Sequence, residues 1–346
     1  MINSEFSQFK NITLHKVGNK LSNEGVRFSK STIQPDEEIG RLLLKYFLTP
    51  FKQNEYYHFY HESDVNLNEV FTYASAIFNN QDNLYEQSIN IAKHLYEQSS
   101  HPKIRSGELY VVYLTGCMIE GETIDAIGLF KSESRETYLK VYSSNDNFEI
   151  DKEDGININK LDKGCLIFNK EREKGYLVAV IDNQKNSDTQ YWMDHFLHLI
   201  NRVDEYHHTK NVLTLCKNFV TEKMPEEFTL SKAEQADLLN KSVNFFKENK
   251  SFDFNEFTNQ IIQDKEVIKT FNTYKSEFET ERDISIANEF NISESAVKKQ
   301  AKVFKSVIKL DKNFHIYVHG NREYIVKGFD ESTGLHYYQI YFKEEN

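Results

Sequence analysis

The spacing of apolar residues changes along this chain, and each change predicts a different kind of element. Between residues 107 and 182 apolar residues recur at every second position, which is typical of strands with one buried face. Turn-forming residues such as Gly121, Asn145 and Gly175 separate these segments. The region therefore predicts one mainly antiparallel sheet, with strands at 109–114, 124–131, 138–142, 164–168 and 176–181.

Helical spacing precedes and follows this region. Residues 34–49, 66–79 and 83–98 place their apolar side chains three or four positions apart, as do residues 188–201 and 204–222. We expect these helices to cover the sheet. Shorter alternating segments at 12–17, 26–33 and 56–61 predict additional strands. Met224 and Pro225 then mark a boundary, so the predicted domains are residues 1–225 and 226–346.

The second predicted domain is mainly helical, with helices near 231–249, 254–263 and 265–278. A short helix at 284–290, a break at Asn291 and a longer helix beginning at Ser293 form a helix-turn-helix-like pair. Alternating segments at 314–319, 323–328 and 337–342 predict a terminal β-meander. The fold class is therefore α+β.

The predicted last helix carries lysines along one face. Lys298, Lys302, Lys305, Lys309 and Lys312 are spaced four, three, four and three apart, with Lys299 beside them. Apolar residues, among them Val297 and Phe304, form a second stripe that would dock the helix. A basic face on the second helix of such a pair favours DNA contact, although a solvated lysine stripe that binds nothing is the alternative.

Charge makes this stripe stand out. The chain has a formal net charge of −11, which argues against a protein that coats DNA with its whole surface. From Ala296 to Lys312, however, six lysines stand against Asp311 alone. A DNA contact must therefore be local.

Motifs for other chemistry are absent from the sequence, so neither a cofactor nor a metal site is predicted. The chain lacks phosphate-binding glycine loops, HExxH and CxxC, and its three cysteines are widely separated. Asp194, His195 and His198 are interpreted as ordinary polar positions of a helix. We find no export signal and no run of about 18 apolar residues, which predicts a cytoplasmic protein without a membrane partner.

Four segments of the first domain resemble the bacterial nucleoid-associated protein family of the NdpA type. They are HPKIRSGELYVVYL (101–114), AIGLFKSES (126–134), GININKLDKGCLIFN (155–169) and DTQYWMDHFL (188–197). The resemblance implies a cytoplasmic bacterial protein that is found with the nucleoid, that is expected to bind DNA and that has no established enzymatic activity. It supplies no DNA-contacting residues.

These observations predict a non-enzymatic protein that binds double-stranded DNA with little sequence specificity. The predicted contacts are Lys298, Lys299, Lys302, Lys305 and Lys309, which would meet phosphates. An acidic interaction module that a partner recruits to the nucleoid is the alternative, and other nucleoid proteins are candidate partners. A metal-dependent nuclease that uses Asp125, Lys131 and Glu133 is a further alternative. The oligomeric state stays open.

Overall fold

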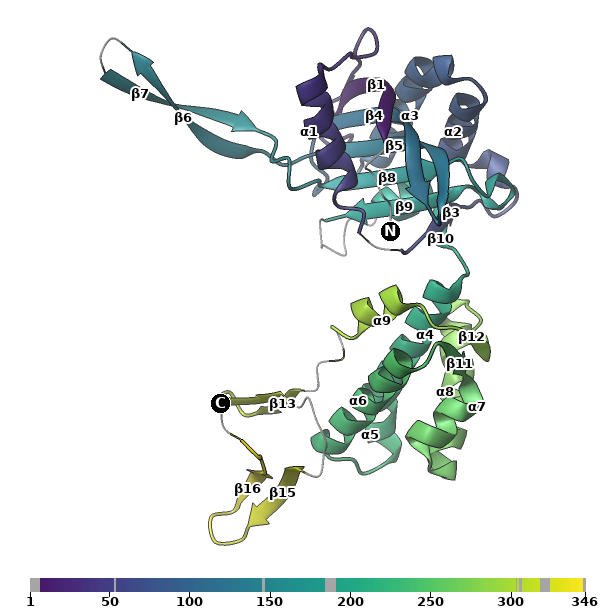
Figure 1. Cartoon of the computed structure of the whole chain (residues 1–346), viewed down its shortest axis with the longest axis vertical. Helices are drawn as coiled ribbons and strands as arrows, with labels where there is room; N and C mark the ends of the chain where they lie inside the picture. The colour runs from purple at the N-terminus through teal and green to yellow at the C-terminus, as the bar shows by residue number, and fades with distance from the viewer. Residues whose placement is uncertain are drawn as a thin grey trace. The chain divides into compact units, whose positions relative to one another are not determined.

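The computed structural model of this chain describes residues 7–344 except 53, 145–146, 184–190, 303, 305–306 and 318–323 (Figure 1). It divides into two compact units, Met1–Arg202 and Val203–Asn346. The division therefore lies before the helix predicted at 204–222, whereas the sequence suggested residue 225. The reason is that the apolar side of this helix, including Val212 and Phe219, belongs to the core of the second unit.

An antiparallel sheet organises the first unit. Among the described residues it has eight strands in the order β10-β3-β9-β8-β5-β4-β1-β2. The strands are β1 (Gln8–Val17), β2 (Val26–Arg27), β3 (Tyr57–Phe59), β4 (Gly107–Ile119), β5 (Glu122–Ser132), β8 (Lys163–Phe168), β9 (Leu177–Asp182) and β10 (Leu199–Asn201). The prediction of a mainly antiparallel sheet in this region is confirmed.

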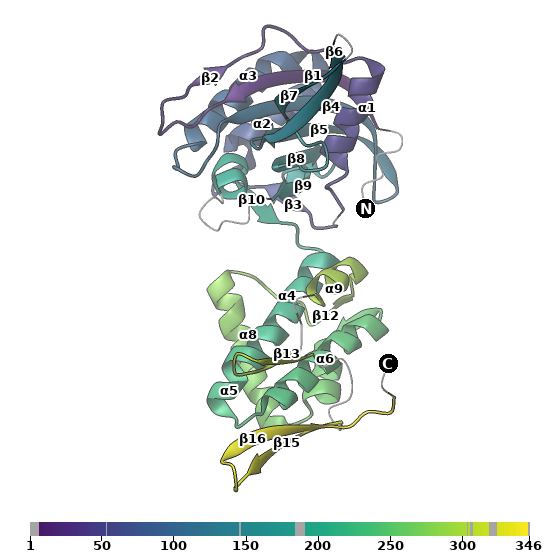
Figure 2. The same ribbon diagram turned by 90° about the vertical axis from the view of Figure 1, so that its left-hand side faces the viewer.

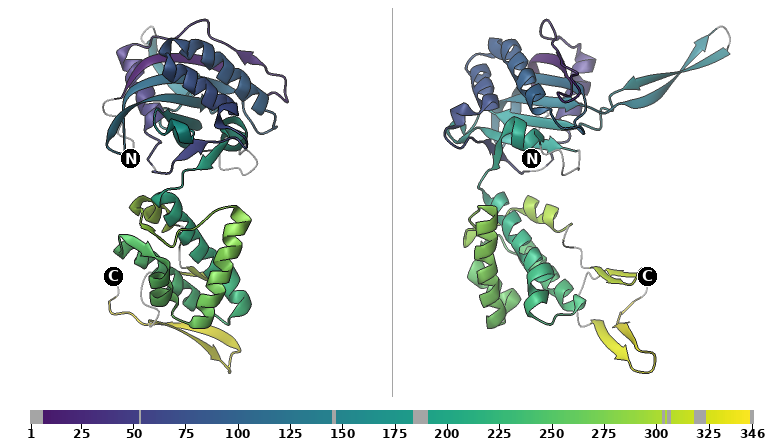
Figure 3. Two further views of the ribbon diagram at one scale, coloured as in Figure 1. Left: turned by 90° about the vertical axis from the view of Figure 1, so that its right-hand side faces the viewer. Right: turned by 180° about the vertical axis from the view of Figure 1, so that it is seen from behind.

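Helices cover both faces of this sheet (Figures 1 and 3). They are α1 (Glu37–Leu48) on one face, and α2 (Glu69–Asn79) and α3 (Leu84–Gln98) on the other. Alternation along β5 explains the two layers, because Ile127 and Leu129 lie in the core with α2 and α3. Phe130 points to the opposite face and stacks on Phe47 of α1, with ring centroids 4.1 Å apart.

Short helical segments complete the first unit. They are the 3₁₀ turns η1 (Val65–Leu67), η2 (Gln81–Asn83) and η3 (Arg172–Lys174), and the π-helical segment η5 (Tyr191–Leu197). The helix predicted at 188–201 therefore ends at Leu197, and its last residues form β10 instead; residues 188–190 lie outside the described residues. Trp192 of η5 is fully buried in the core beneath α2 and α3.

The strand predicted at 138–142 does not join the main sheet. It lies in β6 (Glu136–Ser144), which pairs with β7 (Asn147–Gly155). In the described part of the chain these two strands form a separate two-stranded sheet. This hairpin extends away from the rest of the first unit (Figure 1).

The second unit is a helical bundle with small hairpins (Figure 2). Its helical segments are α4 (Glu205–Asn218), η6 (Phe219–Lys223), α5 (Met224–Glu227), α6 (Lys232–Glu248), α7 (Phe254–Phe257), η7 (Thr258–Ile262), α8 (Lys265–Arg282) and α9 (Glu294–Gln300). Phenylalanines fill its core, and Phe254 of α7 stacks on Phe271 of α8 with centroids 5.6 Å apart. Ser231 and Glu234 form a capping box that begins α6.

Three two-stranded antiparallel sheets accompany these helices in the described residues of the second unit. They pair β11 (Ser251–Asp253) with β12 (Glu289–Asn291), β13 (Val307–Leu310) with β14 (Phe314–Tyr317), and β15 (Ile325–Asp330) with β16 (Leu335–Ile340). The predicted terminal strands are therefore present, and they lie in two separate hairpins, β13–β14 and β15–β16. Together the two units confirm the α+β fold class.

Candidate nucleic-acid interface

The helix-turn-helix prediction is wrong in its first helix. No helix covers residues 284–290, and Phe290 lies on β12, paired with Phe252 of β11. The two rings stack with centroids 4.8 Å apart. Ile286 is buried, and its N–H donates to the Glu279 carboxylate at 2.6 Å. Burial of alternate residues, Ile284 and Ile286, in the same core explains the extended backbone.

The second helix is also shorter than predicted. Ser293 is its N-cap, as expected, and accepts the Ala296 N–H. However, α9 ends at Gln300, and the chain is a strand again from Val307. β-Branched Val307 and Ile308 favour a strand there, and Ile308 packs against the alanines of α6.

The predicted lysines therefore do not share one helical face. Lys298 and Lys299 lie on α9, and Lys302 lies in the turn that follows. Lys309 lies on β13, and Lys305 is outside the described residues. Of the four predicted contacts that the structure describes, it places Lys298, Lys299 and Lys302 on or just after α9 and Lys309 on a separate strand.

Helix α9 is held firmly by its apolar side. Ala296 and Val297 are buried, and the Ser293 N–H donates to the Thr209 hydroxyl of α4 at 3.0 Å. The opposite side leaves Lys298 exposed, while Lys302 is exposed after the helix end. Lys299 is half-buried, with its ammonium 6.0 Å from the centre of the Tyr206 ring.

A groove beside α9 adds two lysines that the sequence pattern did not predict as DNA contacts. It has a volume of about 690 Å³, and Lys247, Lys250 and Lys298 line it over an apolar floor that includes Phe246 and Val297. Glu248 and Glu294 also line it. Lys247 lies in the last turn of α6 and Lys250 lies two residues after its end, more than forty residues before α9. A basic residue near a helix C-terminus was the available signal.

The lysines around this groove keep their charge available. Among the described residues, no ion pair involves Lys247, Lys250, Lys298 or Lys302. Exposed ammonium groups without carboxylate partners are suited to contact phosphates, where each acts as a point charge. The arrangement therefore offers a local basic surface on an acidic protein.

The residues of the nuclease alternative do not converge. Asp125 and Lys131 are six residues apart on β5, which separates them by about 20 Å. The Asp125 carboxylate instead accepts the Tyr113 hydroxyl at 2.8 Å. Within the described residues, no cluster of three or more histidine, cysteine, aspartate or glutamate side chains could hold a metal ion.

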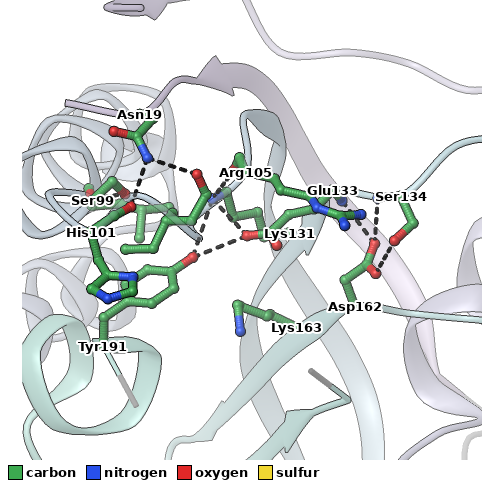
Figure 4. Close-up of polar contacts among 12 residues, drawn as sticks. Asn19, Ser99, His101, Arg105, Lys131, Glu133, Ser134, Asp162, Lys163 and Tyr191 are labelled. Atoms are coloured by element: carbon green, nitrogen blue, oxygen red, sulfur yellow. Dashed lines mark hydrogen bonds and ion pairs between the residues drawn. The ribbon is translucent and has the colours of Figure 1, made fainter. Parts of the chain in front are cut away.

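Lys131 and Glu133 instead belong to a buried polar cluster (Figure 4). The Lys131 ammonium lies 2.8 Å from the Glu133 carboxylate and donates to the Arg105 carbonyl at 2.9 Å. The Tyr191 hydroxyl donates to the same carboxylate at 3.0 Å. Burial lowers the pKa of Lys131, against the opposing effect of Glu133, and raises the pKa of Tyr191 well above its ordinary value.

A second lysine stands beside the first. Lys163 of β8 pairs in register with Lys131 of β5 and with Asp182 of β9. Its ammonium donates to both oxygens of Asp182, at 2.8 and 2.9 Å, so the two like charges have separate acidic partners. Asp162 accepts the backbone N–H groups of Glu133 and Ser134.

The four segments that resemble the nucleoid-associated family meet in this cluster. Residues 101–114 supply the Arg105 carbonyl, residues 126–134 supply Lys131 and Glu133, residues 155–169 supply Lys163, and residues 188–197 supply Tyr191. Each of these polar groups has a partner inside the protein. The cluster therefore joins three strands to η5 and fits a structural role.

Comparison with known proteins agrees with this resemblance. A family model described as nucleoid-associated protein YejK matches residues 13–333. No curated protein matches the chain. In the described part of the chain, no helix is both long enough and apolar enough to cross a membrane. Since the family match covers most of both units, the chain belongs to the bacterial nucleoid-associated protein family.

Proposed function

We propose that this protein binds double-stranded DNA directly, with little sequence preference, and that it catalyses no reaction on the DNA. The observation that carries the proposal is the groove beside α9, which Lys247, Lys250 and Lys298 line without ion pairs among the described residues. Lys302 extends the basic surface beyond the helix, and Lys299 lies next to Lys298. Membership of a nucleoid-associated family supports the choice of a polyanionic partner in the nucleoid.

The charge distribution supports contact through this surface alone. Lysine neutralises a phosphate and releases its counterions, which gives affinity without reading bases. No arginine is available at the groove for bidentate contact with guanine. The remaining surface carries the excess of carboxylates and repels the duplex. Such a protein would bind DNA in one orientation and would not coat it.

Charge reversal at the groove tests the proposal. The variant Lys298→Glu/Lys302→Glu should bind a short duplex at least about tenfold more weakly at moderate salt, as measured by fluorescence anisotropy. The matched control is Lys265→Glu/Lys269→Glu on α8, which changes the net charge equally at exposed positions of the same unit. The control should retain most of the affinity. Equal losses in both variants would reduce the effect to net charge and contradict a local site.

The rival function is an acidic interaction module that reaches the nucleoid through another protein. The observation that favours it is the net charge of −11. A gel shift with the purified protein at low salt separates the two functions, because an interaction module that does not bind DNA gives no shift.

The proposal that the protein catalyses no reaction on DNA is tested by incubating it with supercoiled plasmid and Mg²⁺. We expect the plasmid to remain intact.

A further inference from the structure

The β6–β7 hairpin has no role in the proposed DNA contact, yet residues 137–143 and 147–154 of its strands are all exposed. Each strand has nine residues, which gives a ribbon of about 30 Å. Among the described residues neither strand pairs with any other strand of the chain. The ribbon extends from the body of the first unit in both views that show it from the side (Figures 1 and 3).

The register divides the ribbon into two unlike faces. Leu139 pairs with Lys152, Val141 with Ile150, and Ser143 with Phe148, so the side chains of these pairs share one face. We call this the apolar face of the arm. The four large apolar side chains on it are highly exposed: Leu139 at 75%, Val141 at 60%, Phe148 at 72% and Ile150 at 70%.

The opposite face is polar and acidic. It carries Glu149, Asp151 and Glu153, with Lys140 between them and 3.9 Å from Glu153. Tyr142 also lies on this face, and its hydroxyl donates to Glu149 at 3.1 Å. Solvent therefore suits this face, while the described residues of the first unit leave the apolar face without cover.

Such an arm is not stable alone. An isolated two-stranded hairpin is at best marginally stable in water, and three or more strands or a packed face are needed to hold it. A contiguous apolar patch that protrudes from a folded protein marks an interaction site. The apolar face is therefore suited to pack against an occupant.

We propose that the apolar face packs against the same face of a second copy of this chain, to form a symmetric dimer through the arms. The charges on this face favour a copy of itself, because Lys152 and Asp154 are its only charged residues and sum to zero. A twofold axis can place Lys152 of each arm near Asp154 of the other. Duplex DNA is a poor occupant, since the arm strands carry five carboxylates against two lysines.

Sedimentation of the full chain tests this proposal. The wild type should be a dimer at micromolar concentrations, and Val141→Asp/Ile150→Asp should raise the dissociation constant at least about tenfold. The matched control, Tyr138→Asp/Tyr142→Asp, places equal charge on the opposite face and should remain a dimer. The fluorescence of Trp192, the single tryptophan, should be unchanged in both variants because the arm lies outside the core that holds it.

Three outcomes would overturn the proposal. They are a wild type that stays monomeric, a Val141→Asp/Ile150→Asp variant that dimerises as well as the wild type, and a control variant that dissociates as much as Val141→Asp/Ile150→Asp does.

The salt dependence of dimerisation is an independent test. Because the interface is apolar and each chain carries a net charge of −11, added salt should leave dimerisation unchanged or strengthen it. Dimerisation that weakens steeply with salt would also contradict the proposed packing.

Discussion

Lysine occurs in two contrasting settings in this protein. In the first unit Lys131 and Lys163 are completely buried, and each meets a carboxylate at 2.8 Å. In the second unit Lys298 and Lys302 are exposed beside the α9 groove, without ion pairs among the described residues. The first pair binds carboxylates within the protein, whereas the second pair can bind an external anion.

The difference follows from desolvation. An ammonium group that leaves water loses its hydration, so burial is tolerated only where carboxylates and carbonyls replace the water. Once paired in this way, a lysine cannot also neutralise a phosphate. An exposed lysine contributes little to stability but keeps its charge for a ligand. Removing a buried lysine should therefore damage the fold, and removing an exposed one should damage binding.

The largest effect is expected at Lys131. The substitution Lys131→Met preserves most of the volume but leaves the Glu133 carboxylate buried without its cation. We expect it to lower the free energy of unfolding of the first unit by about 3–5 kcal/mol. Urea unfolding followed by Trp192 fluorescence measures this, because the single tryptophan lies in the same core.

A double variant sharpens that result. Lys131→Met/Glu133→Leu removes both charges, so it should recover most of the stability that Lys131→Met loses. If the double variant is as unstable as the single one, packing and not charge pairing sets the cost. A Lys131→Met variant as stable as the wild type would contradict the claim that buried lysines stabilise the fold and exposed lysines do not.

An intermediate effect is expected at His15, a buried titratable group of the first unit. Its Nε2 lies 2.8 Å from the Ser88 hydroxyl, and its Nδ1 accepts the Ser29 N–H. Burial lowers the pKa of His15 to about 4 from 6.5. Because the unfolded chain binds the proton more tightly, this stability is complete above pH 6.5 and is lost as the pH falls toward 4.

With solvent screening allowed for, the loss from pH 7.5 to pH 5 should be about 1 kcal/mol. Trp192 fluorescence during urea unfolding at the two pH values measures it. The variant His15→Gln should show a smaller difference between them. An identical pH dependence in wild type and variant would show that His15 is not the titrating group.

The smallest effect on stability is expected at Lys298. The substitution Lys298→Met should change the free energy of unfolding by less than about 0.5 kcal/mol, because the side chain is exposed. It should nevertheless weaken DNA binding by about fivefold, since one phosphate contact is lost. Circular dichroism during thermal unfolding and fluorescence anisotropy measure the two effects. A Lys298→Met variant that is destabilised while its DNA binding is unchanged would show that Lys298 serves the fold and not the ligand.

The core of the first unit was predictable because strong local patterns specify it. The alternation in β4, β5, β8 and β9 predicted these strands, and the α2 apolar stripe predicted a covering helix. The arm was predicted as a strand but not as a separate ribbon. Its apolar residues alternate as those of a core strand do, and no local signal shows that they lie outside the core of the first unit.

The site was less predictable because it depends on long-range packing. Ile284 and Ile286 fit a short helix as well as an extended segment, and only the core of the second unit selects the latter. Lys247 and Lys250 meet Lys298 across more than forty residues of chain. Likewise, Lys131 and Lys163 are indistinguishable from surface lysines until the register places them side by side.

The salt dependence of DNA binding tests the central claim most directly. If Lys247, Lys250, Lys298 and Lys302 meet phosphates, the logarithm of the affinity should fall with the logarithm of the salt concentration at a slope of about −3 to −4. The Lys298→Glu/Lys302→Glu variant should reduce that slope by about 2. A wild-type slope near zero, or an equal slope in the variant, would contradict the account.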